Sequence, residues 1–156
     1  TDACYKVIDN FGKTLGGVKA FSTIAQFGTD DEAPVVEYKV YVKEAGTYNL
    51  ELFTAPNNPV VYKGKMYVGL SVNNAAYQAV NTIPDAGYIP WVSPDWAEGV
   101  LSQIHKTTAK ISLQKGENTI AFKAMDPAVV LQKLVIAREG VTVPDSYLGP
   151  KESYVK

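Results

Sequence analysis

The chain has 156 residues, of which 46% are hydrophobic and 20% are charged, as is typical of one globular domain with a real core. Its net charge is −1 with no block of like charges, so there is no electrostatic reason to expect nucleic acid or a membrane surface as a partner. No apolar run approaches the roughly 20 residues that a membrane-spanning helix needs. We therefore expect a single domain over residues 1–156 that binds neither nucleic acid nor a membrane.

The first clear pattern is an alternation with a period of two in residues 35–43 and again in residues 47–53. Such alternation predicts strands with one buried face. The Glu-Ala-Gly segment at 44–46 predicts a turn, so we interpret the two strands as a hairpin. The side chains expected to face the core are Val36, Tyr38, Val40, Val42, Tyr48, Leu50 and Leu52.

The same alternation continues in residues 65–72, through Met66, Val68, Leu70 and Val72. The asparagine pair at 73–74 predicts a left-handed turn, from which residues 76–81 return as a partner strand. Before these segments, the glycine-containing stretch at 16–27 is expected to hold one or two strands.

The best helix candidate is residues 95–106, with Asp95 as its N-cap. Gly99 lies inside it and weakens the prediction by about 1 kcal/mol. Strands are then expected over 107–113 and, after a turn at 114–117, over 118–124.

Residues 129–136 carry apolar side chains on both faces, which predicts a central strand covered on both sides. Residues 141–156 are expected to form an irregular tail. Seven or eight regularly spaced strands with turn signals predict an all-β fold, an antiparallel β-sandwich or jelly roll.

Most catalytic and metal-binding patterns are missing from the sequence. Cys4 is expected to be a thiol without a catalytic role, and His105 an exposed histidine without a role; one of each cannot form a closed zinc site. The acidic run at 29–34 lacks EF-hand spacing and is interpreted as a solvated loop, although a calcium site of carboxylates and carbonyls stays open. The glycine-rich segment at 12–17 lacks Walker spacing.

Four carboxylates lie near the loop at 85–96 or after it, and a glycosidase needs two of them roughly 5–10 Å apart across a pocket. Nothing in their spacing enforces that distance, so we expect no catalysis by this chain alone. These residues are Asp85, Asp95, Glu98 and Asp126.

The loop at 85–96 carries Tyr88 and both tryptophans, Trp91 and Trp96, among prolines. Flat aromatic rings cover the C–H face of a sugar while polar groups reach its hydroxyls, so this composition is typical of a saccharide site. An alternative is that the tryptophans plug the end of the sandwich or dock against a neighbouring domain.

A second loop, residues 55–65, and the turn before the last strand carry polar groups that we expect to converge with the aromatic loop at one edge of a jelly roll. In this hypothesis Asn57, Asn58 and Asp126 bind sugar hydroxyls. Lys63, next to Tyr62, pairs with a uronate carboxylate, an exposed ion pair worth about 0–1 kcal/mol. The candidate carbohydrate-binding residues are Trp91, Trp96, Tyr88, Tyr62, Asn57, Asn58, Lys63 and Asp126.

Two segments, MDPAVVLQKLVI at 125–136 and PDSYLGPKES at 144–153, resemble the C-terminal end of glycoside hydrolase family 115, the xylan α-glucuronidases. Segments 11–21, 33–42 and 53–59, and the run from DWAEGV to GENTI, are similar to earlier parts of the same C-terminal domain. The resemblance covers residues 7–153. It implies a galactose-binding-like jelly roll of the carbohydrate-binding-module type.

The resemblance also implies a parent enzyme that removes glucuronic acid or its 4-O-methyl ether from xylan, with its catalytic acids on upstream domains. No catalytic residue is therefore carried over to this chain. The implied function is a non-catalytic module that binds xylan or glucuronic-acid-decorated xylan in a secreted, periplasmic or cell-surface enzyme. It needs no cofactor, although related modules often hold a structural calcium.

Two alternatives remain open. In one, the chain is a structural or dimerising domain whose aromatic loop packs on the catalytic domains without binding sugar. In the other, it is a stand-alone module that belongs to a different polysaccharide-degrading protein.

Overall fold

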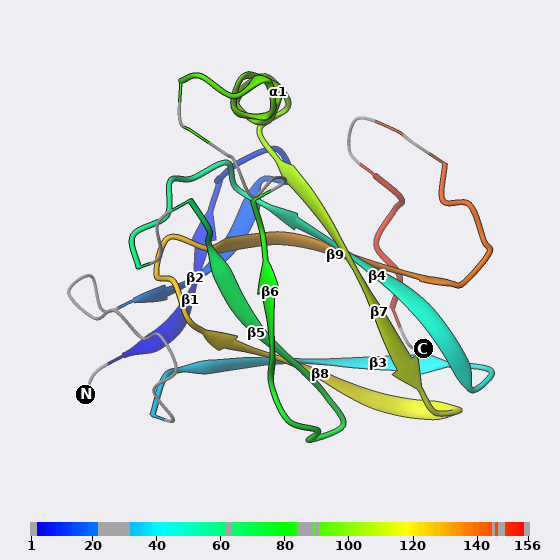
Figure 1. Cartoon of the computed structure of the whole chain (residues 1–156). Coiled ribbons are helices and arrows are strands. Elements are labelled where there is room, and N and C mark those ends of the chain that lie inside the picture. Colours follow the sequence, from blue (N-terminus) through cyan, green and yellow to red (C-terminus); the bar gives the residue numbers. More distant parts are fainter. Residues whose placement is uncertain are drawn as a thin grey trace.

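The computed structural model describes residues 3–21, 32–61, 64–83, 89, 91–144, 146 and 149–154. Over these residues the chain forms nine strands and one helix, and the strands build two antiparallel sheets (Figure 1). The strands are β1 (Cys4–Asp9), β2 (Gly16–Phe21), β3 (Val35–Val42), β4 (Gly46–Thr54), β5 (Tyr67–Val72), β6 (Gln78–Asn81), β7 (His105–Leu113), β8 (Gly116–Ala124) and β9 (Val130–Arg138), and the helix is α1 (Pro94–Ser102).

The five-stranded sheet has the order β1-β2-β9-β4-β7, and the four-stranded sheet has the order β3-β8-β5-β6. This confirms the predicted antiparallel sandwich and the central place of β9. The core lies between the sheets: β4 contributes Leu50 and Leu52, and β8 contributes Ile120 and Phe122, all fully buried. Each such side chain stabilises the fold by roughly 1.5–3 kcal/mol relative to exposure.

The predicted hairpin over residues 35–53 is wrong, because its two strands belong to different sheets. β3 pairs with β8, whereas β4 pairs with β7 and β9, so residues 43–45 cross from one sheet to the other. Tyr48 supports this crossing by donating its hydroxyl hydrogen to the carbonyl oxygen of Glu44 at 2.7 Å. The inward-facing residues are nevertheless those that the alternation predicts, because a hairpin and a crossing leave the same apolar period.

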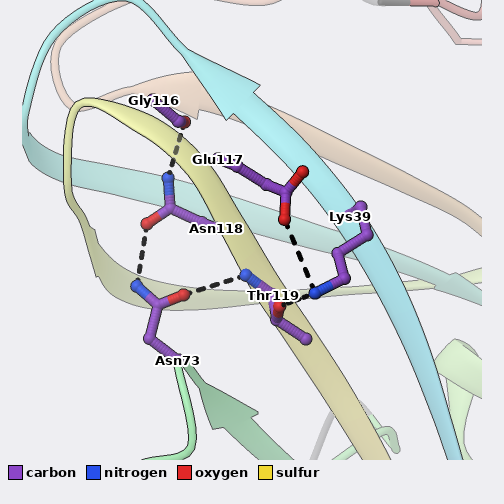
Figure 2. A network of polar contacts seen from close by, with 6 residues as sticks. All are labelled: Lys39, Asn73, Gly116, Glu117, Asn118 and Thr119. Carbon is purple, nitrogen blue, oxygen red and sulfur yellow. Dashed lines mark hydrogen bonds and ion pairs between the residues drawn. The ribbon is translucent and has the colours of Figure 1, made fainter.

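The second hairpin is confirmed. β5 pairs with β6, and Asn73 and Asn74 join them with φ values of 51° and 62°, the left-handed conformation expected for an asparagine pair. Asn73 also reaches β8: its amide nitrogen donates to Asn118 Oδ1 at 2.8 Å, and its Oδ1 accepts the backbone N–H of Thr119 at 2.8 Å (Figure 2). The hairpin end is therefore tied to the neighbouring strand.

The helix is shorter than predicted and begins one residue earlier. Ser93, not Asp95, is the N-cap, and Pro94 occupies the first turn, where a missing N–H costs nothing. Gly99 is required here, because a Cβ on it would lie 2.0 Å from His105 Nε2. His105 is only 3% exposed, which overturns the expected exposed histidine.

The ends of the chain complete the fold. β1 pairs with β2 and was not predicted, since the short segment CYKVID shows no clear apolar alternation, and Lys6, Val7 and Asp9 are exposed. Within the expected strand region at 16–27, residues 22–27 lie outside the described residues. The described residues after β9 are irregular, as predicted. None of the described helical segments is long and apolar enough to cross a membrane.

Candidate site at the loop end of the sandwich

Four connections meet at one end of the sandwich, which we call the loop end: β1–β2, β4–β5, β6–α1–β7 and β8–β9 (Figure 1). Side chains tie them together. Gln132 links the first and third connections, and Asp126 and Asn57 link the second and fourth. The predicted convergence of the 55–65 loop with the turn before the last strand is therefore observed.

Trp91 and Trp96 form a ring pair on this end. Their ring centroids lie 4.6 Å apart with the planes tilted by 44°. Trp96 is half-buried and packs against the main core, whereas Trp91 is 77% exposed. One tryptophan thus anchors the pair and the other presents its ring to solvent.

The turn that carries Trp91 is held by the backbone and side chain of its neighbours. Ser93 Oγ accepts the N–H of Ile89 at 2.8 Å, and the N–H groups of Val92 and Ser93 donate to the carbonyl of Ile89. Trp91 has a φ of 72°, a conformation rare for a bulky residue and costing on the order of 1–3 kcal/mol. Strain of this kind is concentrated at functional sites, so the ring is held out at some expense to the fold.

An open hollow of about 370 Å³ lies beside α1, between the β1–β2 turn and the β4–β5 connection. Trp96 and Val100 are one helical turn apart on α1, so Trp96 lies on the same face of the helix as the residue that lines the hollow. The lining residues are Phe11, Gly12, Ala55, Pro56, Asn57, Val100, Gln103 and Gln132. Of the predicted site residues, the described part of the chain places only Asn57 in this lining.

Gln132 is the residue that sequence reasoning missed. Its Oε1 accepts the backbone N–H of Lys13 at 2.9 Å, and its Nε2 donates to the carbonyl of Gln103 at 3.0 Å. Gly12 allows this approach: its φ is 65°, and a Cβ there would lie 2.3 Å from Gln132 Oε1. The available signal was a single amide interrupting the apolar strand VVLQKLVI.

The polar candidates have different roles: one is buried and holds the backbone, and the others lie at the surface. Asp126 is only 2% exposed: its Oδ2 accepts the N–H groups of Val60 and Val61, and its Oδ1 accepts that of Ala128. It therefore holds the β4–β5 connection rather than facing solvent, which corrects the expected contact with a sugar hydroxyl. Asn57 donates its amide to the carbonyl of Ala128 at 2.7 Å and still lines the hollow, while Asn58 is exposed.

The three remaining candidates are Tyr62, Lys63 and Tyr88. They lie outside the described residues, as does Asp85. Among the described residues, no three His, Cys, Asp or Glu side chains are grouped to hold a metal ion. Part of the acidic run at 29–34 lies outside the described ranges.

The imidazole of His105 packs against Gly99 of α1. Burial lowers the pKa of its imidazole, while a hydrogen bond to the backbone of Asp95 and the charges of Asp95 and Glu98 act in the opposite direction. A neutral imidazole is the form that fits this buried place.

Comparisons with known proteins point to one family. The profile of the glycosyl hydrolase family 115 C-terminal domain matches residues 1–152. No curated protein sequence matches the chain significantly.

Three solved structures share the fold. A family GH115 4-O-methyl-α-glucuronidase with specificity for decorated arabinogalactans is 15% identical with a TM-score of 0.64, over 86% of this chain and 16% of that one. A family 35 carbohydrate-binding module from Clostridium thermocellum is 21% identical with a TM-score of 0.56, over 88% of both chains. An exo-β-1,3-galactanase from Phanerochaete chrysosporium is 18% identical with a TM-score of 0.56, over 85% of this chain and 26% of that one.

Proposed function

Since the chain belongs to the glycosyl hydrolase family 115 C-terminal domain, we propose that it is a non-catalytic carbohydrate-binding module that recognises xylan or glucuronic-acid-decorated xylan. It spans 16% of the length of the solved GH115 glucuronidase, so the catalytic domains of the parent enzyme are assigned to the rest of that protein. The module works without a cofactor and is secreted, periplasmic or on the cell surface.

The observation that carries the proposal is the exposed ring of Trp91, which lies in the turn before α1 and is backed by Trp96, a residue of the helix that borders the open hollow. A rigid indole offers a sugar ring a large apolar face with little loss of side-chain entropy. Asn57 at the hollow and the exposed Asn58 supply groups that hydrogen-bond hydroxyls. Because the hollow is open, much of a bound sugar stays in water and the affinity is low.

The test is affinity electrophoresis of the isolated chain in gels containing glucuronoxylan, with arabinogalactan as the competing polymer. Trp91→Ala should weaken binding about tenfold, because it removes the stacking surface. Tyr41→Ala is the matched control: Tyr41 is 57% exposed on β3 and pairs with Glu117, near the opposite end of the sandwich. Equal loss of binding in the two variants, or none in either, would refute the site.

A second candidate function, docking against the upstream domains of the parent enzyme, is favoured by a different observation. Five large apolar side chains are exposed on α1 and the turn before it: Ile89, Trp91, Val92, Val100 and Leu101. Clustered exposed apolar groups of this kind often mark protein interfaces. In this alternative the surface is buried by the parent enzyme and binds no sugar.

The two functions separate in the intact parent glycosidase. Val92→Lys with Leu101→Lys places charges in the apolar cluster and leaves Trp91 in place. Under the docking function the parent unfolds at a lower temperature while the isolated domain is unchanged; under the sugar function neither changes. Val7→Lys, at a side chain 69% exposed on β1, is the matched control.

A further inference from the structure

A second groove lies on the outer face of the five-stranded sheet, away from α1. It has a volume of about 270 Å³ and runs between the strands β4, β7 and β9 and the irregular segment that follows β9. We call it the tail groove and define it by the six residues used below: Asn49, Glu51, Thr108, Val141, Val143 and Pro144.

Strand register fixes the floor of the tail groove. Glu51 stands at its centre, paired with Thr108 on β7 and with Val135 on β9. Two residues along β4, Asn49 is paired with Ala137 and points to the same face. Neighbouring strands lie about 4.8 Å apart, so a carboxylate, a hydroxyl and an amide project close together from this floor.

These three polar side chains are available, because none of them forms a hydrogen bond or an ion pair with another described residue. The lysines around them are engaged. Lys110 forms an ion pair with Glu139 at 2.5 Å, and Lys133 donates to the carbonyl of Pro150 at 2.5 Å. The groove therefore offers unpaired acceptors and donors within an otherwise satisfied surface.

The wall opposite this floor is apolar and fixed. Val141, Val143 and Pro144 line it. Val143 packs with Phe53 on the outer face, and Gly149 closes over Phe53, where a Cβ would lie 3.1 Å from the ring. The wall is thus part of the folded domain, and a ligand meets a groove that is already formed.

We propose that the tail groove is a second saccharide site, which binds a neutral segment of a glycan chain. Apolar Val and Pro side chains cover the C–H groups of a sugar, while a carboxylate, an amide and a hydroxyl hydrogen-bond its hydroxyls. Glu51 places a carboxylate at the centre of the floor, whereas Lys106 in the same lining lies over the ring of Phe53, so unsubstituted sugar residues rather than uronic acids are the proposed ligand. The choice of a saccharide as the ligand rests on the proposed function, whereas the position of the groove does not.

The experiment is an NMR titration of the ¹⁵N-labelled chain with xylohexaose, a neutral probe. Amide shifts are expected in strands β4, β7 and β9 around Glu51, with glucuronic acid alone causing none there. Glu51→Ala with Thr108→Ala should weaken this response about fivefold, the loss of one to two hydrogen bonds. Thr47→Ala with Ser112→Ala is the matched control, since this pair lies on the same two strands and outside the groove lining.

Each outcome decides one of the two sites. Shifts at the groove that survive Trp91→Ala support the second site. Shifts confined to α1 and the β4–β5 connection overturn it and leave the proposed function standing. Shifts confined to the groove keep it and remove the loop-end site, and no shifts at all with xylohexaose overturn the second site. Glu51→Gln, which retains size and hydrogen bonding, should recover part of the binding if the fold is intact.

Discussion

The two ends of this sandwich are built differently. At the end opposite α1, the connections are short, and the buried amide of Asn118 holds them. It bonds the N–H and C=O of Gln114, and Figure 2 shows its bonds to the C=O of Gly116 and the amide of Asn73. At the loop end the connections are long, and they present an exposed tryptophan and a hollow. One end maintains the fold, which leaves the other end free to carry recognition.

The largest expected effect is at the fold-maintaining end. Asn118→Ala leaves three partly buried backbone groups and the amide nitrogen of Asn73 without these partners, so we expect a loss of about 3 kcal/mol in the free energy of unfolding, measured by urea denaturation. Glycan binding of the folded fraction should not change. Asn58→Ala, at an exposed position of the loop end, should change stability by less than about 0.5 kcal/mol. If Asn58→Ala is the more damaging variant, the comparison between the ends fails.

The second effect tests the packing of α1 on His105. By helix propensity Gly99→Ala should stabilise by about 1 kcal/mol, but the added methyl group would collide with His105, so we expect a net loss of about 2 kcal/mol. Glycan binding should weaken with it, because α1 carries Trp96. Ala97→Gly in the same helix is the control and should cost about 1 kcal/mol without a collision. A more stable Gly99→Ala variant would show that α1 does not pack on His105.

The third effect concerns the β4–β5 connection. Asp126→Asn replaces an acceptor of three backbone N–H groups with an amide that can only partly accept them, so stability should fall by about 1–2 kcal/mol. Hydrogen exchange at the amides of Val60 and Val61 should accelerate. Asp9→Asn, on exposed β1, should leave both measurements unchanged. Unchanged exchange in Asp126→Asn would mean that the carboxylate does not hold the connection.

The smallest effect is a pH dependence. Burial lowers the pKa of His105 in the folded state, so the unfolded chain takes up its proton first as the pH falls. The stability contributed by the neutral imidazole is complete above the unfolded value of about 6.5 and is lost as the pH falls from there through the folded pKa. Urea midpoints of the wild type should decline in this window, and His105→Gln should remove that part of the slope. A rise in stability on acidification would contradict the burial.

Much of the sandwich is predictable from local pattern. The alternation gave the inward residues of β3, β4, β5 and β8, and the apolar run at 129–136 gave the central β9. The pairing between strands was harder to predict, because a crossing between sheets at 43–45 and a hairpin leave the same apolar period in the sequence. Strand β1 was not predicted, because a short edge strand buries little apolar surface and so shows no clear apolar alternation.

The site was harder to predict than the sheets. The exposed Trp91 agrees with the composition of its loop, but the burial of Asp126 and His105 depends on backbone groups and a helix that are distant in sequence. The sequence alone does not show which hydrogen-bond partners a polar side chain will have in the folded protein. Gln132 could not be recognised for the same reason. It is an amide in an apolar strand, and its role in joining two connections depends on partners that are distant in sequence.

That amide limits how the loop end can move. Gln132 joins the β1–β2 turn to the C-terminal end of α1 across the hollow, so both walls are fastened to one side chain. Moving the turn or the helix end outward therefore lengthens a hydrogen bond to Gln132. Under the proposed function, a glycan with a bulky branch at this point would have to break one or both of these hydrogen bonds to enter, which would favour unbranched chains.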